Sequence, residues 1–178
     1  MHRIPVILVA MLLVLSTASN TLAADKKAFD FTLNDLQNKQ VSLKSLLGEG
    51  PVYIAFWATW CKPCIKELEI VSKVYEDYKD RGFQLVGINE DAGRSHSKVK
   101  SFVRAKNWNF PILLDDNEKV KRDYKAFGLP YSVILDAEGN IIHTAYGFRA
   151  GDEAKLKEMI EPHLLESEED TSEKETEE

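Results

Sequence analysis

The most constraining feature of the sequence is a strongly apolar segment that runs directly into two closely spaced cysteines. Residues 52–57 read VYIAFW, and an almost unbroken apolar run of this length predicts a β-strand covered on both faces. Trp60-Cys61-Lys62-Pro63-Cys64 follows, and apolar residues then return at helical spacing from Ile65 to Tyr78. Residues 83–88 are a second apolar strand. The segment therefore predicts a βαβ unit, whose crossover helix makes the two strands parallel.

The remaining apolar segments extend this unit into an α/β sandwich with a mixed sheet flanked by helices. Residues 29–33 and 40–42 predict a β-hairpin, and Ser42 or Lys44 opens a short helix that ends at Gly48. A helix marked by Val99 to Val103 and a strand at 111–114 come next. A helix through Val120, Tyr124 and Phe127 is expected to end at Gly128. The chain closes with a hairpin of residues 131–135 and 141–145 and a last helix from Leu156 to Leu165.

The two ends of the chain differ from the body in composition. Arg3 precedes an apolar run and then small residues up to Ala24, which predicts a secretory signal over residues 1–24. The run is shorter than the roughly 20 residues of a membrane-spanning helix, although an uncleaved anchor stays as the alternative. Residues 166–178 hold eight acidic residues and one lysine and predict a disordered acidic tail. The domain between them, residues 25–165, carries no net formal charge, which argues against nucleic-acid binding.

The two cysteines are better explained by chemistry than by cross-linking. Only two residues separate Cys61 from Cys64, and so short a loop restrains the unfolded chain very little. Thiol–disulfide exchange needs one thiolate to attack and a second thiol to resolve the mixed disulfide. At a helix N-terminus Cys61 gains anion stabilisation from free N–H groups, and Lys62 adds a positive charge. Pro63 is tolerated in a first turn. We therefore predict a redox dithiol in which Cys64 acts second.

Three other cysteine chemistries fit the sequence less well. A c-type haem site would need histidine where Ile65 stands. A zinc site would need two more ligands, and the three histidines of the predicted domain are scattered singly: His96, His143 and His163. A peroxidatic cysteine would have a threonine further upstream than Thr59. No metal or organic cofactor is expected.

Residues 56–64, FWATWCKPC, resemble the active-site stretch of the thioredoxin superfamily. The surroundings resemble its exported TlpA/ResA-type branch, which includes the cytochrome c maturation thioredoxins. Residues 29–35 with 41–43 are similar to the N-terminal hairpin that this branch adds, and residues 110–115, 128–130 and 136–139 match its later landmarks. Across residues 28–165 the resemblance implies a thioredoxin-like sandwich with an added N-terminal β-hairpin.

The resemblance assigns roles to further residues. Pro130 matches the family's cis-proline, which faces the disulfide, and Leu129 would offer backbone groups to a partner strand; an ordinary trans turn proline is the alternative. Cytoplasmic thioredoxins have a buried aspartate where this chain has Ala55. The TlpA/ResA branch instead places a glutamate at Glu67, where it could accept the Cys64 proton. A solvated helix glutamate is the alternative for Glu67.

The tryptophans and two departures from the family pattern add further expectations. Trp60 resembles the aromatic that flanks the attacking thiol, whereas Trp57 and Trp108 are expected in the core. Glu69 replaces a common proline, so the helix is expected to run straighter. Tyr131 replaces the usual threonine after the cis-proline, beside the substrate groove. The expected substrate-binding residues are Trp60, Lys62, Pro63, Leu129 and Tyr131.

The sequence and the resemblance together predict a monomeric, periplasmic or cell-envelope thiol:disulfide oxidoreductase that reduces partner proteins. Its partners would be disulfide-containing or CxxC-containing proteins, with an apocytochrome c as one candidate, and a membrane thiol donor would re-reduce it. A disulfide-donating oxidase or isomerase is one alternative. A binding module with an incidental disulfide is another. The direction of electron flow stays open at this point, because it depends on how strongly the fold stabilises the reduced thiolate.

Overall fold

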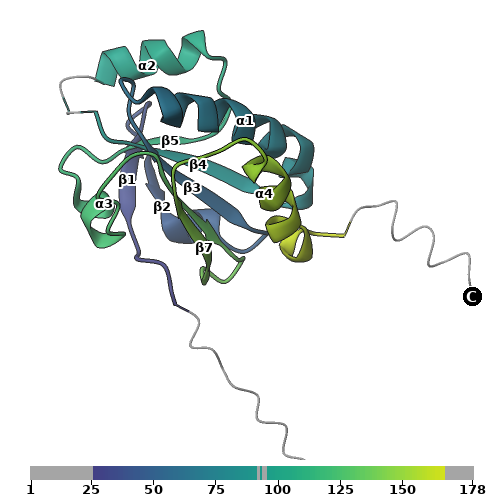
Figure 1. Cartoon of the computed structure of the whole chain (residues 1–178). Helices are drawn as coiled ribbons and strands as arrows, with labels where there is room; N and C mark the ends of the chain where they lie inside the picture. The colour runs from purple at the N-terminus through teal and green to yellow at the C-terminus, as the bar shows by residue number, and fades with distance from the viewer. Residues whose placement is uncertain (1–25, 92, 94–95, 167–178) are drawn as a thin grey trace, which may run out of the picture.

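A single mixed sheet of seven strands organises the chain, in the order β2-β1-β5-β4-β3-β6-β7 (Figure 1). The computed structural model describes residues 26–91, 93 and 96–166. The strands are β1 (Thr32–Asp35), β2 (Gln40–Ser42), β3 (Val52–Trp57), β4 (Gln84–Asn89), β5 (Ile112–Leu114), β6 (Tyr131–Leu135) and β7 (Ile141–Tyr146). The α-helices are α1 (Lys62–Tyr78), α2 (His96–Ala105), α3 (Lys119–Asp123) and α4 (Asp152–Ile160).

Strand pairing confirms the predicted mixed α/β fold. β3 pairs in parallel with β4, and β4 with β5, as the βαβ crossovers require. β1 and β2 form the N-terminal hairpin, which joins the sheet through antiparallel pairing of β1 with β5. β6 returns antiparallel beside β3 and forms the second hairpin with β7. β3 therefore lies inside the sheet, and every residue of this strand is buried.

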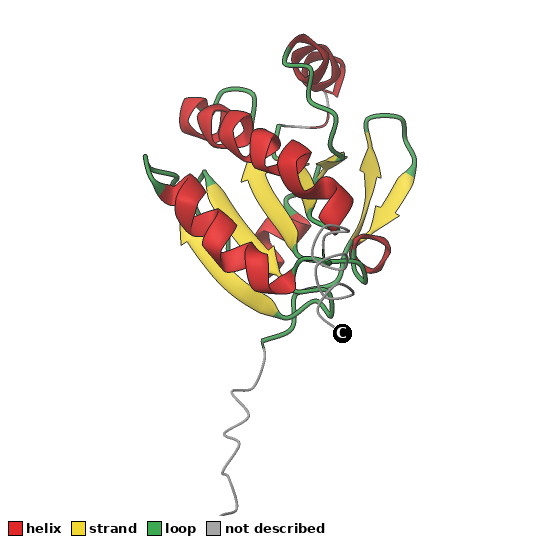
Figure 2. Cartoon of the chain, turned by 90° about the vertical axis from the view of Figure 1, so that its right-hand side faces the viewer, coloured by secondary structure: helices red, strands yellow, loops and turns green. Residues whose placement is uncertain are grey.

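The helices form two layers around the sheet. α1 and α4 lie side by side on one face (Figures 1 and 2). A core cluster on this face joins residues of α1, α2 and α4 to Tyr53, Ala55 and Trp57 of β3. The opposite face packs on α3 and on a short 3₁₀ helix, η2 (Leu43–Leu46), whose N-cap is Ser42. Successive β3 side chains thus belong to different cores, as expected for a strand buried on both sides.

One helix is shorter than the sequence predicts. α3 ends at Asp123 rather than at Gly128, because Lys125 has a left-handed φ of 55° and breaks the helix. Phe127 was expected on the apolar stripe of this helix, but its side chain is 82% exposed. Two other helices end in 3₁₀ turns: η3 (Lys79–Arg81) links α1 to Gly82, and η5 (Glu161–His163) follows α4. Residues 120–130 therefore approach the sheet as a loop.

The predicted signal, residues 1–24, lies outside the described residues, as does the acidic tail beyond Glu166. Within the described part of the chain, no helix combines the length and the apolar character needed to cross a membrane. Backbone contacts hold both ends of the described chain. Lys27 bridges to Asn140, and the Leu165 N–H donates to the Arg81 carbonyl at 2.9 Å.

Candidate active site

Cys61 and Cys64 form a disulfide at the N-terminus of α1. Their Cα atoms are 5.3 Å apart, and Cys61 is the N-cap residue of the helix. The Cys64 N–H lies 3.3 Å from Cys61 Sγ, the position at which a capping side chain accepts a hydrogen bond. Cys61 is 5% exposed and Cys64 is fully buried. A thiolate on Cys61 would therefore be stabilised by a helix N-terminus, and Cys64 lies behind it.

A buried hydrogen-bond network fixes the loop that leads into Cys61. Asp91, after β4, accepts hydrogen bonds from the Thr59 N–H and the Thr59 hydroxyl, both at 2.7 Å. Asn89 donates its side-chain amide to the same carboxylate at 2.9 Å. The Glu90 N–H donates to the Trp57 carbonyl at 2.8 Å. These contacts tie the end of β4 to the loop two residues before Cys61.

Glu67 lies inside the molecule, one helical turn after Cys64. Its side chain is 1% exposed and points from α1 toward the sheet, where the Tyr53 hydroxyl donates to Glu67 Oε1 at 2.6 Å. The second carboxylate oxygen, Oε2, has no hydrogen-bond partner among the described residues. The alternative of a solvated helix glutamate is therefore wrong for this residue.

Burial changes the proton affinity of Glu67. Removal from water raises the pKa of Glu67 to about 7, although the hydrogen bond from Tyr53 and the nearby Ser132 hydroxyl counter part of the rise. The same burial, together with the nearby Glu67 charge, raises the pKa of Tyr53 well above its usual value. Tyr53 consequently stays protonated and serves as a donor. Glu67 can gain or lose a proton near neutral pH, as a general acid–base must.

The loop before β6 carries the cis peptide bond that the resemblance predicts, between Leu129 and Pro130. Pro130 is buried and Leu129 is partly exposed. Tyr131 is almost fully buried, and its ring packs on Phe56 and Tyr146 with centroid separations of 5.8 and 4.6 Å. Its bulk therefore lies in the core on the α3 side of the sheet, opposite the face that holds Glu67.

The surface beside the disulfide is apolar and positively charged. Trp60 is 66% exposed, and Lys62 and Pro63 are exposed in the first turn of α1. Trp57 and Trp108 lie in the core as predicted, with ring centroids 5.2 Å apart. Among the described residues, Trp60 is thus the tryptophan that is most exposed to a partner.

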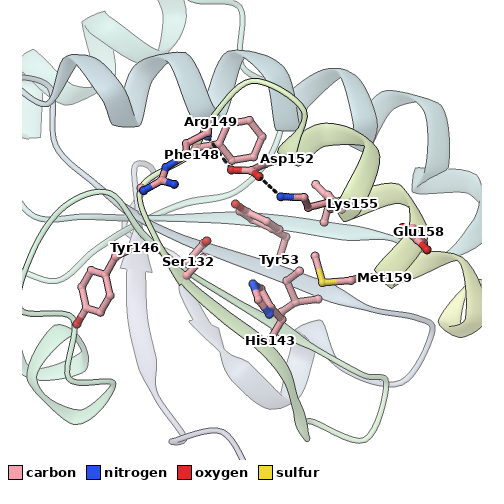
Figure 3. Close-up of a pocket in the computed structure, with 14 residues that line it drawn as sticks. Tyr53, Ser132, His143, Tyr146, Phe148, Arg149, Asp152, Lys155, Glu158 and Met159 are labelled. Carbon is pink, nitrogen blue, oxygen red and sulfur yellow. Dashed lines mark hydrogen bonds and ion pairs between the residues drawn. The ribbon is translucent and has the colours of Figure 1, made fainter.

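A cleft of about 450 Å³ opens between β6, β7 and α4, and we call it the α4 cleft (Figure 3). Ile134, Leu156 and Met159 are among its apolar lining residues, and His143 and Arg149 are among its polar ones. The Tyr53 ring reaches into the cleft from β3, between Ser132 and Asp152 (Figure 3). The hydroxyl that binds Glu67 therefore belongs to a side chain that also lines a solvent-accessible cleft.

Sequence reasoning missed Tyr53, Ser132 and Asp91. Each belongs to a strand or loop that lies far from Cys61 and Cys64 in the sequence or outside the CxxC motif. The sequence around each of them is that of an ordinary strand or loop, so nothing in it indicated a role in the site. In the described residues, no three His, Cys, Asp or Glu side chains converge in an arrangement that could hold a metal ion.

Comparison with known proteins assigns the family. Residues 24–144 match the AhpC/TSA family. The chain belongs to this family. Its similarity to the thiol-disulfide oxidoreductase ResA of Bacillus cereus (strain ZK / E33L) is 34% identity over 139 residues, covering 78% of this chain and 75% of that protein. The chain is accordingly a thioredoxin-like thiol-disulfide oxidoreductase of the ResA type.

Solved structures agree with this fold. A thiol:disulfide interchange protein from Bacteroides sp. matches with a TM-score of 0.68 and 28% identity, over 79% of this chain and 91% of that one. A thioredoxin family thiol:disulfide interchange protein from Chlorobium tepidum TLS matches with a TM-score of 0.66 and 26% identity, over 78% and 96% of the two chains. The predicted thioredoxin-like fold is therefore confirmed.

Proposed function

We propose that the chain reduces disulfides of partner proteins outside the cytoplasm, with Glu67 as the proton acceptor for the resolving cysteine. The observation that carries this proposal is the fully buried Glu67 carboxyl, one turn after Cys64, with its pKa raised to about 7. A carboxylate held in this way can take a proton from a buried thiol at neutral pH.

The proposed reaction has two exchange steps. The Cys61 thiolate attacks one sulfur of the partner disulfide, forms a mixed disulfide and releases the other partner sulfur as a thiolate. Cys64 then gives its proton to Glu67, and its thiolate attacks Cys61 Sγ. The partner's second sulfur leaves, the Cys61–Cys64 disulfide forms, and the partner has gained two electrons. A membrane thiol donor would restore the dithiol.

The reductive direction is supported by the surroundings of Cys64. A thiolate on Cys64 would form beside a carboxyl group that is already desolvated, and two negative charges there would repel each other. The reduced protein therefore keeps Cys64 protonated and gains no thiolate stabilisation at this position, so the fold holds the dithiol in its reduced form less strongly and the protein is a better electron donor. The cap position of Cys61 acts in the opposite direction, because it stabilises a thiolate.

The proposal also assigns a surface and a location. Leu129 and Pro130 would hold the partner chain by backbone contacts, with Trp60, Lys62 and Pro63 on the exposed rim and Tyr131 supporting the loop from inside. Residues 1–24 would direct export, residues 25–165 would form the catalytic domain, and residues 166–178 would keep the protein soluble. A CxxC segment of an apocytochrome c is one candidate partner.

Trapping tests the proposal. Cys64→Ser removes the resolving thiol, so mixed disulfides between Cys61 and true partners should accumulate in the native compartment and be identified by mass spectrometry. The matched control is the double variant Cys61→Ser/Cys64→Ser, which should trap nothing. Cys61→Ser should lose all disulfide-reducing activity. Failure to trap any protein outside the cytoplasm would contradict the proposal and would favour a small-molecule thiol as substrate.

A further inference from the structure

Because Glu67 is buried, its carboxyl group has no direct route for exchanging a proton with solvent. Near neutral pH part of the reduced protein holds Glu67 as the acid, which must release its proton to solvent before the carboxylate can accept the proton of Cys64. Its side chain is 1% exposed, and Cys64 beside it has no exposed surface. The proton therefore needs a path from the interior to solvent.

Tyr53 is the described side chain that both contacts Glu67 and reaches a solvent-accessible cleft. Its hydroxyl donates to Glu67 Oε1 at 2.6 Å, and the residue lines the α4 cleft (Figure 3). Ser132 lines the same cleft from the neighbouring strand β6, where it pairs with Ala55, two residues beyond Tyr53 along β3. Two hydroxyl groups thus stand between the buried carboxyl and the cleft.

We propose that Tyr53 is the positioning residue through which Glu67 exchanges its proton with water in the α4 cleft. The inference rests on the proposed function, because it needs Glu67 to receive the Cys64 proton. In the exchange the Tyr53 hydroxyl turns from Glu67 Oε1 toward the cleft, so that the protonated Glu67 donates its proton to the Tyr53 oxygen while the Tyr53 hydroxyl gives its own proton to a cleft water. The products are a Glu67 carboxylate, an unchanged tyrosine and a protonated water, so atoms and charge balance.

Several charged or titratable side chains surround Tyr53 in the α4 cleft. The charged or titratable groups that face Tyr53 and Glu67 come from α4, β7 and the loop between them: Asp152, Lys155, Glu158, His143 and Arg149. Lys155 pairs with Asp152 at 3.1 Å. The Asp152 charge still acts on Tyr53, whose pKa it helps to raise. His143 from β7 and Glu158 from α4 also line the cleft (Figure 3).

A probe that isolates the resolving step tests the inference. Reduced protein reacts with an aromatic disulfide, 5,5′-dithiobis(2-nitrobenzoate), to form a mixed disulfide on Cys61. Release of the second coloured thiol then reports attack by Cys64, and its rate is measured across pH by stopped flow. Tyr53→Phe keeps the ring and removes only the hydroxyl. Tyr75→Phe is the matched control, because Tyr75 lies on α1 and packs on Phe110 away from the cleft.

Loss of the Tyr53 hydrogen bond should raise the proton affinity of Glu67. We expect the pH midpoint of the resolving step to rise by about one unit in Tyr53→Phe, which slows the reaction about tenfold below neutral pH. Tyr75→Phe should behave as the unmodified protein. Ala145→Phe, which fills the cleft beside Ser132, should also slow the step. An unaltered rate and midpoint in Tyr53→Phe would overturn the inference. An unaltered rate in Ala145→Phe would also overturn it, because Tyr53 would then only tune the proton affinity of Glu67.

Glu67→Gln separates this inference from the proposed function. If the pH step disappears in Glu67→Gln but stays in place in Tyr53→Phe, Glu67 is the proton acceptor and only the route through Tyr53 is wrong. If the pH step survives in Glu67→Gln, the proposed role of Glu67 fails and the inference fails with it.

Discussion

The Glu67 carboxyl couples the stability of the fold to pH. Its pKa rises from an unfolded value of 4.5 to about 7 in the folded chain, so between these values the folded state holds a proton that the unfolded state has lost. Folding is therefore favoured at low pH, and this contribution is lost as pH rises through about 7. Within this window the buried acid is neutral, and above it a desolvated charge must be accommodated.

We predict that Glu67→Gln is more stable than the unmodified oxidised protein at pH 8, by at most about 3 kcal/mol, and nearly equal to it at pH 4. Urea unfolding at several pH values measures this difference. Burial raises the pKa of Glu90 to about 8, so both proteins lose stability toward alkaline pH, and only the gap between them reports Glu67. Glu69→Gln is the control on the exposed side of α1, where the carboxylate pairs with Lys106 at 2.6 Å, so this variant should lose at most about 1 kcal/mol at pH 8 rather than gain stability. A constant difference at all pH values would contradict the assignment.

Some residues of the site could be predicted from the sequence, and others could not. The dithiol, Glu67 and Pro130 stand in one local motif or match a family landmark, so they were visible in the sequence. Tyr53 was read only as part of an apolar strand, because its contact with Glu67 joins β3 to α1. Asp91 was read as a loop residue, although it binds Thr59 across the ends of two parallel strands. Partners of this kind are set by tertiary packing, which a local pattern does not contain.

At the scale of elements, the helical spacing of apolar residues predicted α1 correctly but did not predict how wide its buried face is. The predicted apolar stripe ran from Ile65 to Tyr78. Ile65 is only partly buried, and the buried positions of α1 are Cys64, Glu67, Leu68, Val71 and Val74. The face is wider because α1 packs on the sheet and on α4 together. The prediction for α3 was too long, since Tyr146 holds the loop after it by accepting from the Phe127 N–H and donating to the Lys125 carbonyl.

Gly82 shows how tightly the end of α1 is fitted to the sheet. This residue has φ of 86°, and a Cβ atom placed on it would lie 2.6 Å from the Glu49 carbonyl oxygen. We predict that Gly82→Ala destabilises the oxidised protein by about 2–4 kcal/mol, combining left-handed strain with overpacking. Gly147→Ala is the matched control, with a similar φ of 79° and open space around it, and should cost only about 1–2 kcal/mol. Equal losses in urea unfolding would show that the contact with Glu49 is unimportant.

At the scale of the whole molecule, the reduction potential is linked to folding, because it depends on how much more stable the fold is in its oxidised form than in its reduced form. A disulfide whose reduced form is strongly stabilised by folding is an oxidant, as at about −120 mV, whereas thioredoxin lies at about −270 mV. Two features of this site oppose each other. The cap position of Cys61 favours a thiolate in the reduced protein, and the buried Glu67 disfavours a second thiolate on Cys64.

The proposed reductase requires that the second feature outweigh the first. We therefore predict that the oxidised protein is at least as stable as the reduced protein at pH 7, and that its potential lies nearer −270 mV than about −120 mV. Urea unfolding with and without dithiothreitol measures the stability difference, and equilibration with glutathione measures the potential. Each 30 mV corresponds to about 1.4 kcal/mol for this two-electron couple, so the two measurements must agree. The variant Cys61→Ser/Cys64→Ser should not respond to reductant. A reduced protein more stable by several kcal/mol would instead assign the chain to disulfide donation, because the fold would then drive electrons toward Cys61 and Cys64.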